Sequence, residues 1–221
     1  IPSNLVIIPE LCIGCGNCEA ACPPAASAIK YTHNSKELST LLPRCIEAGA
    51  ESIELHAGVP DDESTIKEWK VVSDSVPNGM ISMCLDRKHL SNEMLIERIK
   101  LAKNIADDRL IIQADGIPMS GGTDDFNTTL QAVSIADFIN KEIKQKYKLF
   151  KNLPVLISGG TNSYTGDLAR KCGVTFNGIT IGTHARKVIT KFKSKPDEIS
   201  DENLKKALIN AKKLILKNLQ S

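Results

Sequence analysis

The chain has 221 residues, of which 42% are hydrophobic and 24% are charged, and its formal net charge is +2. This composition is typical of a soluble globular protein with one large domain and a small appendage. No apolar run approaches the roughly 18 residues that a membrane-spanning helix needs, and no signal peptide is visible. Basic residues gather only after Arg186, on the expected solvent face of a helix without an aromatic stacking platform. We therefore expect neither a membrane nor a nucleic acid as a partner.

The first motif along the chain is a cysteine run, LCIGCGNCEAACPP, at residues 11–24. Its C-x2-C-x2-C-x3-C-P spacing is that of bacterial ferredoxins, in which thiolates hold a [4Fe–4S] cluster. Glycines between the cysteines let the backbone approach the inorganic sulfides. Zinc is the alternative, but zinc sites usually combine two separated C-x2-C pairs. The predicted metal ligands are Cys12, Cys15, Cys18 and Cys22.

Cys22 has two candidate roles. In two-cluster ferredoxins the fourth cysteine of such a run binds the other cluster. The flanking segments NLVIIPE and SAIKY resemble the hairpin strands in the second half of a ferredoxin repeat. We therefore expect a second cysteine run upstream of Ile1 in the intact protein, with Cys22 bound to its cluster. One cluster held by all four local cysteines is the alternative.

The remaining cysteines are expected to be small buried hydrophobic residues: Cys45 on the apolar face of a helix, Cys84 in a strand and Cys172 at a helix end. Cysteines that cluster without a disulfide-like spread favour a reducing compartment. We therefore expect a cytoplasmic protein.

After residue 31, helical and strand spacings of apolar residues alternate. Helices are predicted at 37–49, 62–76, 92–106, 128–143, 165–173 and 200–219, with a further short helix after Thr183. Ser200 is the expected N-cap of the last helix, and Pro43 is expected to kink the first helix or set its start. Strands are predicted at 52–57, 80–86, 110–115, 154–159 and 178–183.

Alternating helices and apolar strands predict βαβ units and a parallel sheet, which is the α/β class. The strands end in polar or glycine-rich tips, which in a (β/α)-barrel converge on one face: His56, Asp86, Asp115, the Ser158-Gly159-Gly160 segment and the Thr183-His184 pair. We predict a partial, TIM-like barrel over 35–221, comprising its five C-terminal strands, after a ferredoxin-like module over 1–34. A doubly wound or open five-stranded sheet is the alternative.

The tips of the last two strands suggest a phosphate site. Bare backbone N–H groups at Gly159, Gly160 and Gly182, the start of a helix at Thr183 and the charge of Arg186 would suit an anion. Flavin mononucleotide (FMN) or a phosphorylated sugar would fit, although glycines at strand ends are also ordinary turn residues.

Two further features are candidates for function. The connection at 113–129, QADGIPMSGGTDDFNTT, is longer than usual and could be a lid or a ligand clamp, or else a surface loop. His56 and Asp86 are candidate acid/base groups at a barrel mouth, or polar residues that end strands.

The segments LIIQADGIPMSGGT, LPVLISGGTNSYT and ITIGTHARK resemble the C-terminal region of the cyanobacterial light-dependent period protein family, over about residues 110–190. The resemblance implies an upstream ferredoxin-like segment with two clusters and a redox-sensing role. It transfers no catalytic residues. The circadian role of that family is not carried over, because the lysine-rich composition here departs from that of cyanobacterial members.

The expected function is one-electron transfer or redox sensing through one or two [4Fe–4S] clusters, with a redox partner protein or a small-molecule donor or acceptor. The alternative is an FMN-dependent oxidoreductase whose barrel site is fed by the cluster. A third hypothesis is that the cluster only stabilises the structure and transfers no electrons. The sequence does not separate a sensor from a carrier, since both need the same cluster.

Overall fold

The computed structural model describes residues 18, 21–23, 28–29, 35–117, 124–192 and 199–219. Its centre is a five-stranded parallel sheet in which the strands stand in chain order. The strands are β1 (Ile53–His56), β2 (Ile81–Leu85), β3 (Leu110–Asp115), β4 (Val155–Ser158) and β5 (Gly178–Ile179). Each lies within its predicted range, so the α/β class is confirmed.

One helix precedes β1, a helix follows each strand, and one more helix ends the described chain. They are α2 (Ser35–Glu47), α3 (Asp62–Ser75), α4 (Asn92–Ala106), α5 (Asp125–Phe138), α6 (Thr165–Lys171), α7 (Thr183–Thr190) and α8 (Asp201–Leu219), and a π-helical turn at Ile139–Lys144 extends α5. Polar side chains cap several of them. Asp61 accepts hydrogen bonds from the first turn of α3, and Ser91 accepts one from Met94 N. Ser200 accepts from Asn203 N at 3.3 Å, as an N-cap does.

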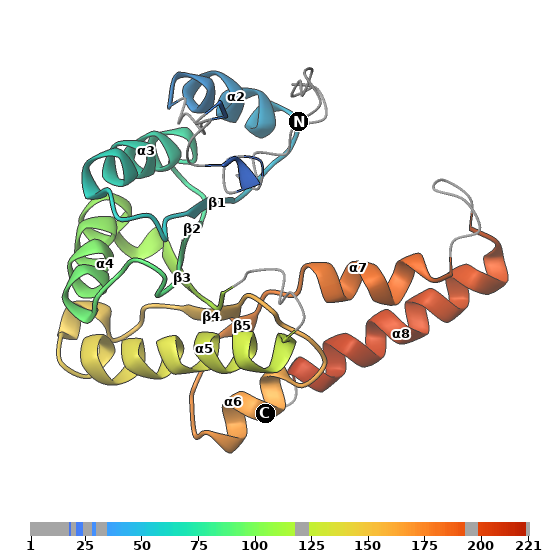
Figure 1. Ribbon diagram of the computed structural model, residues 1–221. Coiled ribbons are helices and arrows are strands. Elements are labelled where there is room, and N and C mark those ends of the chain that lie inside the picture. The colour runs from blue at the N-terminus through green and yellow to red at the C-terminus, as the bar shows by residue number, and fades with distance from the viewer. Residues whose placement is uncertain are drawn as a thin grey trace.

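The sequential strand order decides how the helices are placed. Right-handed crossovers that always advance in the same direction leave their helices on one face of a sheet. Figure 1 shows this arrangement, with α3, α4 and α5 along the outer side of the curved sheet. A doubly wound sheet, with its reversal of strand order and helices on both faces, is therefore excluded for the described strands. Among these strands β1 and β5 are the open edges, so closure into a barrel stays a prediction.

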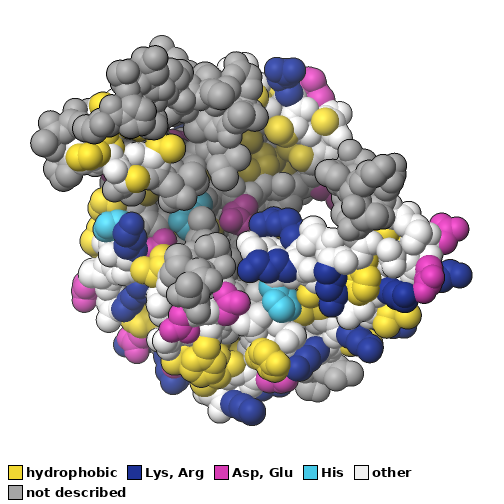
Figure 2. All heavy atoms as spheres, turned by 45° about the vertical axis from the view of Figure 1, so that its right-hand side comes forward, with side chains coloured by type: hydrophobic (Ala, Val, Ile, Leu, Met, Phe, Trp, Pro, Cys, Tyr) yellow, Lys and Arg dark blue, Asp and Glu magenta, His cyan; other side chains and the backbone are white. Residues whose placement is uncertain are grey.

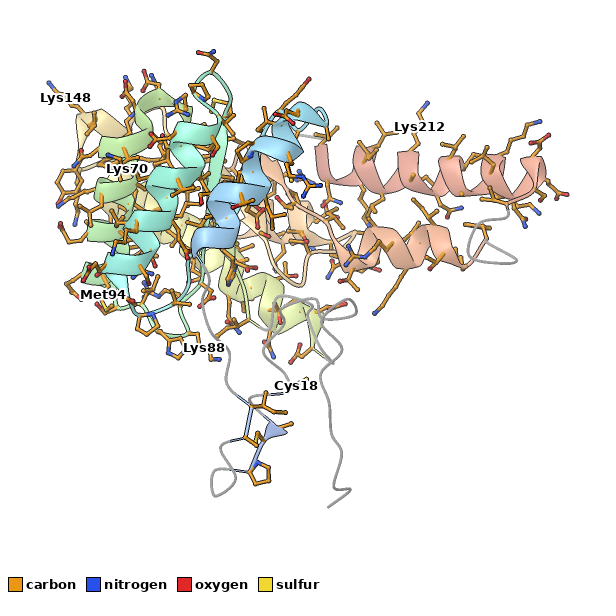
Figure 3. The ribbon with its side chains drawn as sticks, turned by 90° about the horizontal axis from the view of Figure 1, so that it is seen from above. Cys18, Lys70, Lys88, Met94, Lys148 and Lys212 are labelled. Atoms are coloured by element: carbon orange, nitrogen blue, oxygen red, sulfur yellow. The ribbon has the colours of Figure 1, made fainter. Side chains whose placement is uncertain are left out.

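The hydrophobic core lies between the helices and one face of the sheet. Side chains alternate between the faces of a strand, and the core-facing set is Ile81, Met83, Leu85, Leu110, Ile112, Ala114, Val155 and Ile157. Trp69 of α3 is fully buried there, and its Nε1 donates to the carbonyl of Ala102 in α4 at 3.0 Å. Figure 3 shows α3, with Lys70, beside α4, with Met94, in this helix layer.

The opposite face of β1, β2 and β3 is mostly polar, with Ile111 as an apolar member. It carries Glu54, His56, Ser82, Cys84, Gln113 and Asp115, as strand alternation and pairing register require. The strands were expected to be apolar along nearly their whole length. In the structure, only the positions that face the helices are consistently apolar. The polar face is where the candidate site lies.

Three predictions about α2 and the cysteines have mixed outcomes. Pro43 lies inside α2 and does not set its start. Cys84 is buried as expected, but the prediction was wrong for Cys45 and Cys172, which are exposed. In α2 it is Leu42 that is buried, and Cys172 is the C-cap of α6, where the helix ends at the surface.

α7 and α8 pack along each other and extend away from the sheet (Figure 1). Figure 2 shows lysine and arginine side chains interspersed with hydrophobic ones over this region. Asn218 of α8 accepts a hydrogen bond from Gly166 N of α6 at 3.1 Å. It also donates one to Asn162 O, in the segment after β4, at 3.4 Å. No helix in the described part of the chain combines the length and hydropathy that crossing a bilayer requires.

Candidate functional site

Two of the four predicted cluster ligands belong to the described residues. Cys18 is exposed (Figure 3) and Cys22 is half-buried, and both are free thiols. Cys12 and Cys15 lie outside the described residues. Free, accessible sulfurs at ferredoxin spacing are the donor set that an iron–sulfur cluster takes, so the residues present fit this group.

A second group of functional side chains meets at the carboxyl ends of β1, β2 and β3. His56 Nε2 lies 3.5 Å from Asp86 Oδ2, and His56 Nδ1 lies 3.9 Å from Asp115 Oδ2. The thiol of Cys84 donates to the same Asp115 oxygen at 3.4 Å. The strand tips that were predicted to converge, His56, Asp86 and Asp115, therefore do so. We call these three residues and Cys84 the strand-tip cluster.

Sequence reasoning missed two members of this region. Cys84 and Gln113 were assigned to apolar strands, yet each stands two positions before a tip carboxylate. Residues two apart in a strand share a face, and this spacing was the available signal. Gln113 Nε2 donates to Ser82 Oγ at 2.7 Å and also to Glu54, so it forms the polar floor beneath the cluster.

A buried arginine fixes the chain that follows His56. The Arg98 side chain of α4 is fully buried, and its Nη1 donates to Ala57 O at 2.6 Å and also to Val59 O. Its Nε donates to Asp62 Oδ1 at 2.9 Å. Four hydrogen-bonding contacts from one guanidinium tie the loop after β1 and the start of α3 to α4. They thereby hold the end of β1 that carries His56.

Asp86 is held from two sides. Its Oδ1 accepts from Lys88 N at 2.7 Å. Gly58, in the loop after β1, lies so close that an added Cβ would come within 2.2 Å of Asp86 Oδ2. A side chain at position 58 would displace this carboxylate from His56.

Burial and two buried carboxylates, Asp86 and Asp115, have the main effects on the pKa values in the cluster. Burial raises the pKa of Asp115 to about 6. Contact with Asp86 raises the pKa of His56, against the opposing effect of burial, and Asp115 adds to the increase. Burial acts to raise the pKa of Asp86, but the contacts with His56 and Lys88 N outweigh it and the net pKa is lowered. Burial, followed by the charge of Asp115, raises the pKa of the Cys84 thiol, so by itself it is not a nucleophile.

The glycine-rich tips lie on neighbouring strands, where the Thr161 hydroxyl donates to Thr180 O. Gly159 and Gly160 are buried and have positive φ values of 74° and 56°. Gly159 lies against Asp115, because an added Cβ would be 1.9 Å from Asp115 Oδ1. A carboxylate in this position disfavours a bound phosphate at Gly159.

The glycine-rich tip after β5 is exposed to solvent. Gly182 is exposed and caps α7, which begins at Thr183, and Arg186 donates to Thr183 Oγ1 at 3.2 Å. The phosphate site, with FMN as its candidate ligand, stays a prediction. Of the suggested lid at 113–129, residues 113–115 belong to β3 and residues 125–129 to α5, while 118–123 lie outside the described residues.

Gly159→Ala is expected to destabilise the protein by about 2–5 kcal/mol. The positive φ alone costs a non-glycine residue about 1–2 kcal/mol, and the collision with Asp115 and with the backbone of Gly116 adds about 1–3 kcal/mol. Gly173→Ala is the matched control, since Gly173 has φ of 68° and open space around it. Urea denaturation of both variants measures the difference, and equal losses would contradict the close contact at Gly159.

Comparison with known families agrees with this architecture. Residues 45–220 match the model described as light dependent period A C-terminal domain, and this range contains all five strands and the strand-tip cluster. Residues 4–50 match the 4Fe-4S dicluster domain, which contains the whole cysteine run. No curated protein matches the chain. The chain thus carries an iron–sulfur domain at its N-terminal end, and over most of its length it belongs to the light dependent period A C-terminal domain family.

Proposed function

We propose that this protein transfers electrons, or senses redox state, through a [4Fe–4S] cluster held by its cysteine run. The observation that carries the proposal is the run itself. The run has ferredoxin spacing and lies inside the stretch that matches a 4Fe-4S dicluster domain. Its two cysteines within the described residues, Cys18 and Cys22, are free. When bound, such a cluster supplies one-electron chemistry at a potential tuned by its surroundings.

The residues have distinct proposed roles. Cys12, Cys15 and Cys18 are the ligands of one cluster, and Cys22 is a ligand of the same cluster or of a neighbouring one, as in two-cluster ferredoxins. Cys18 is exposed, so the group that it holds is open to a redox partner protein or to a small-molecule donor or acceptor. This exposure supports exchange of electrons over a purely structural cluster.

The remaining chain is proposed to be part of a (β/α)-barrel. The support is the strand order β1 to β5 in sequence, with crossover helices on one face, because a barrel is wound in the same way. The flavin alternative lacks comparable support, since the buried Asp115 carboxylate stands against Gly159 in the suggested phosphate site.

A redox titration tests the proposal. Anaerobically purified protein is expected to show a broad visible absorption that bleaches on reduction and returns on oxidation, with a matching paramagnetic signal from the reduced cluster. Acid treatment should release no flavin. A cluster that changes oxidation state nowhere between about −700 and +450 mV, the range such clusters span, would show that it only stabilises structure.

A further inference from the structure

The strand-tip cluster contains three different metal-ligating atoms in close proximity. His56, Cys84 and Asp115 each offer one ligand atom, and these three atoms lie within 4.8 Å of one another. Zinc bonds of about 2.0–2.3 Å at tetrahedral angles place neighbouring ligand atoms about 3.3–3.8 Å apart. The observed separations are 3.4 Å for sulfur to oxygen and 3.9 Å for nitrogen to oxygen. A single ion could therefore reach all three atoms with small side-chain movements.

Asp86 completes the pattern of a metal-binding histidine. Such histidines usually direct their second ring nitrogen to a carboxylate, which fixes the tautomer and the ring orientation. Here His56 Nε2 faces Asp86 Oδ2 at 3.5 Å, while Nδ1 lies 3.9 Å from Asp115 Oδ2. Asp86 is itself held by Lys88 N. This orientation leaves Nδ1 as the nitrogen available to a metal.

A cation bound at Asp115 Oδ2 would also offset the charge of a buried carboxylate whose other oxygen has no partner in the described part of the chain. Asp115 is 1% exposed, and its Oδ1 has no hydrogen-bond partner in the described part of the chain. Buried carboxylate oxygens without a partner are costly. His56 is the one side chain that forms an ion pair with Asp115 among the described residues. With Asp86 and Glu54 nearby, carboxylates outnumber the single histidine around Asp115.

We propose that His56, Cys84 and Asp115 bind a single zinc-type divalent cation, with Asp86 as the positioning residue for His56. One imidazole nitrogen, one thiolate and one carboxylate oxygen form a donor set that suits Zn²⁺. Three protein ligands leave a fourth position for water or another small ligand. The His56 side chain is 37% exposed whereas those of its partners are buried, so the ion enters from the His56 side. Binding displaces the thiol proton of Cys84.

Zinc binding to the cluster-loaded protein tests this site. Anaerobically purified protein is equilibrated with Zn²⁺ against a competing chelator, and zinc and iron are measured by elemental analysis. The expected result is about one zinc per chain in addition to the cluster iron. X-ray absorption at the zinc edge should show one sulfur at about 2.3 Å and nitrogen or oxygen ligands at about 2.0–2.2 Å.

Matched variants separate this site from the cysteine run. Cys84→Ser should remove the sulfur from the zinc shell, and His56→Gln should lower zinc occupancy, while both retain iron. Asp86→Asn should weaken zinc affinity about 10–100-fold, as loss of such a positioning partner does. Cys18→Ser should lose iron and keep zinc. Cys172→Ser, which changes an exposed cysteine remote from these strands in the sequence, should keep both.

Three results would overturn the proposal: no zinc beyond the background, zinc coordinated by sulfur alone, or zinc retained equally by wild type, Cys84→Ser and His56→Gln. His56 lies partly exposed at a strand end, so His56→Gln remains informative if the buried Cys84→Ser variant fails to fold. Fluorescence of Trp69, the only tryptophan, reports folding in every variant. Loss of iron in Cys18→Ser concerns the cluster alone, so the zinc site and the proposed redox function can fail separately.

Discussion

Cys18→Ser protein that is purified and reconstituted without oxygen is expected to lose its cluster iron and its visible absorption. A serine oxygen is a poor replacement for a thiolate in a cubane, which takes a ligand at each iron. Because Cys18 is exposed and makes no disulfide, its substitution should leave the fold of the 45–220 region intact. Iron and sulfide analysis, with the absorption spectrum, measures the loss, which should approach the whole of about four iron atoms.

The same experiment distinguishes the two roles of Cys22. If Cys22 and Cys18 hold the same cluster, Cys22→Ser should show the same loss of iron as Cys18→Ser. If Cys22 belongs to a second cluster, the two variants should lose different paramagnetic signals. Cys172→Ser is the control, because Cys172 is also exposed but lies at the end of α6. Unchanged iron in Cys18→Ser would contradict the assignment of the run as the cluster site.

Arg98→Met is expected to lower the free energy of unfolding by about 2–6 kcal/mol, because two backbone carbonyls lose their donor. Methionine keeps much of the packing volume but removes every donor. The buried carbonyl of Ala57 and the partly buried carbonyl of Val59 then lose their donor, at about 1–3 kcal/mol each. Asp62 is half-exposed, so water replaces its contact at little cost. Urea denaturation measures the change.

The control for Arg98 is a surface ion pair. Lys67 and Glu63 lie 3.7 Å apart on α3 with both side chains exposed. Lys67→Met should change stability by no more than about 1 kcal/mol, because solvent screens such pairs. A loss in Arg98→Met as small as that in Lys67→Met would show that the loop after β1 is held mainly by other contacts.

Local sequence patterns predicted the positions of most helices and strands. The helix at 92–106 was predicted at its observed bounds from its amphipathic spacing, and the structure adds Ser91 as its N-cap. The five strands were found because short apolar runs bounded by polar or glycine-rich residues have few other solutions. The ends of two elements differ from their predicted bounds. α5 continues through a π-helical turn at Ile139–Lys144, and β5 pairs over only two residues, Gly178–Ile179, because hydrogen bonding to β4 sets its length.

Burial was harder to predict than secondary structure. Cys45 shares a helix face with Leu42, yet Leu42 is buried and Cys45 is exposed, because neighbouring elements cover only part of that face. Cys84 was predicted to be a buried hydrophobic residue and is buried, but its thiol faces the polar side of the sheet, where it donates to Asp115. In a nearly continuous apolar strand, period-two alternation does not indicate which face the helices cover.

The sequence by itself determined the cysteine run, the αβ alternation and the family, because each depends on residues close together in the chain. Only the tertiary structure decided that His56, Cys84 and Asp115 share one site. These side chains come from three strands, and Cys84 and Asp115 are 31 residues apart. Parallel pairing brings them together through its register, His56 opposite Cys84 and Cys84 opposite Gln113. That register follows from burying the apolar face of each strand under the helices, and it joins residues that are far apart in the sequence.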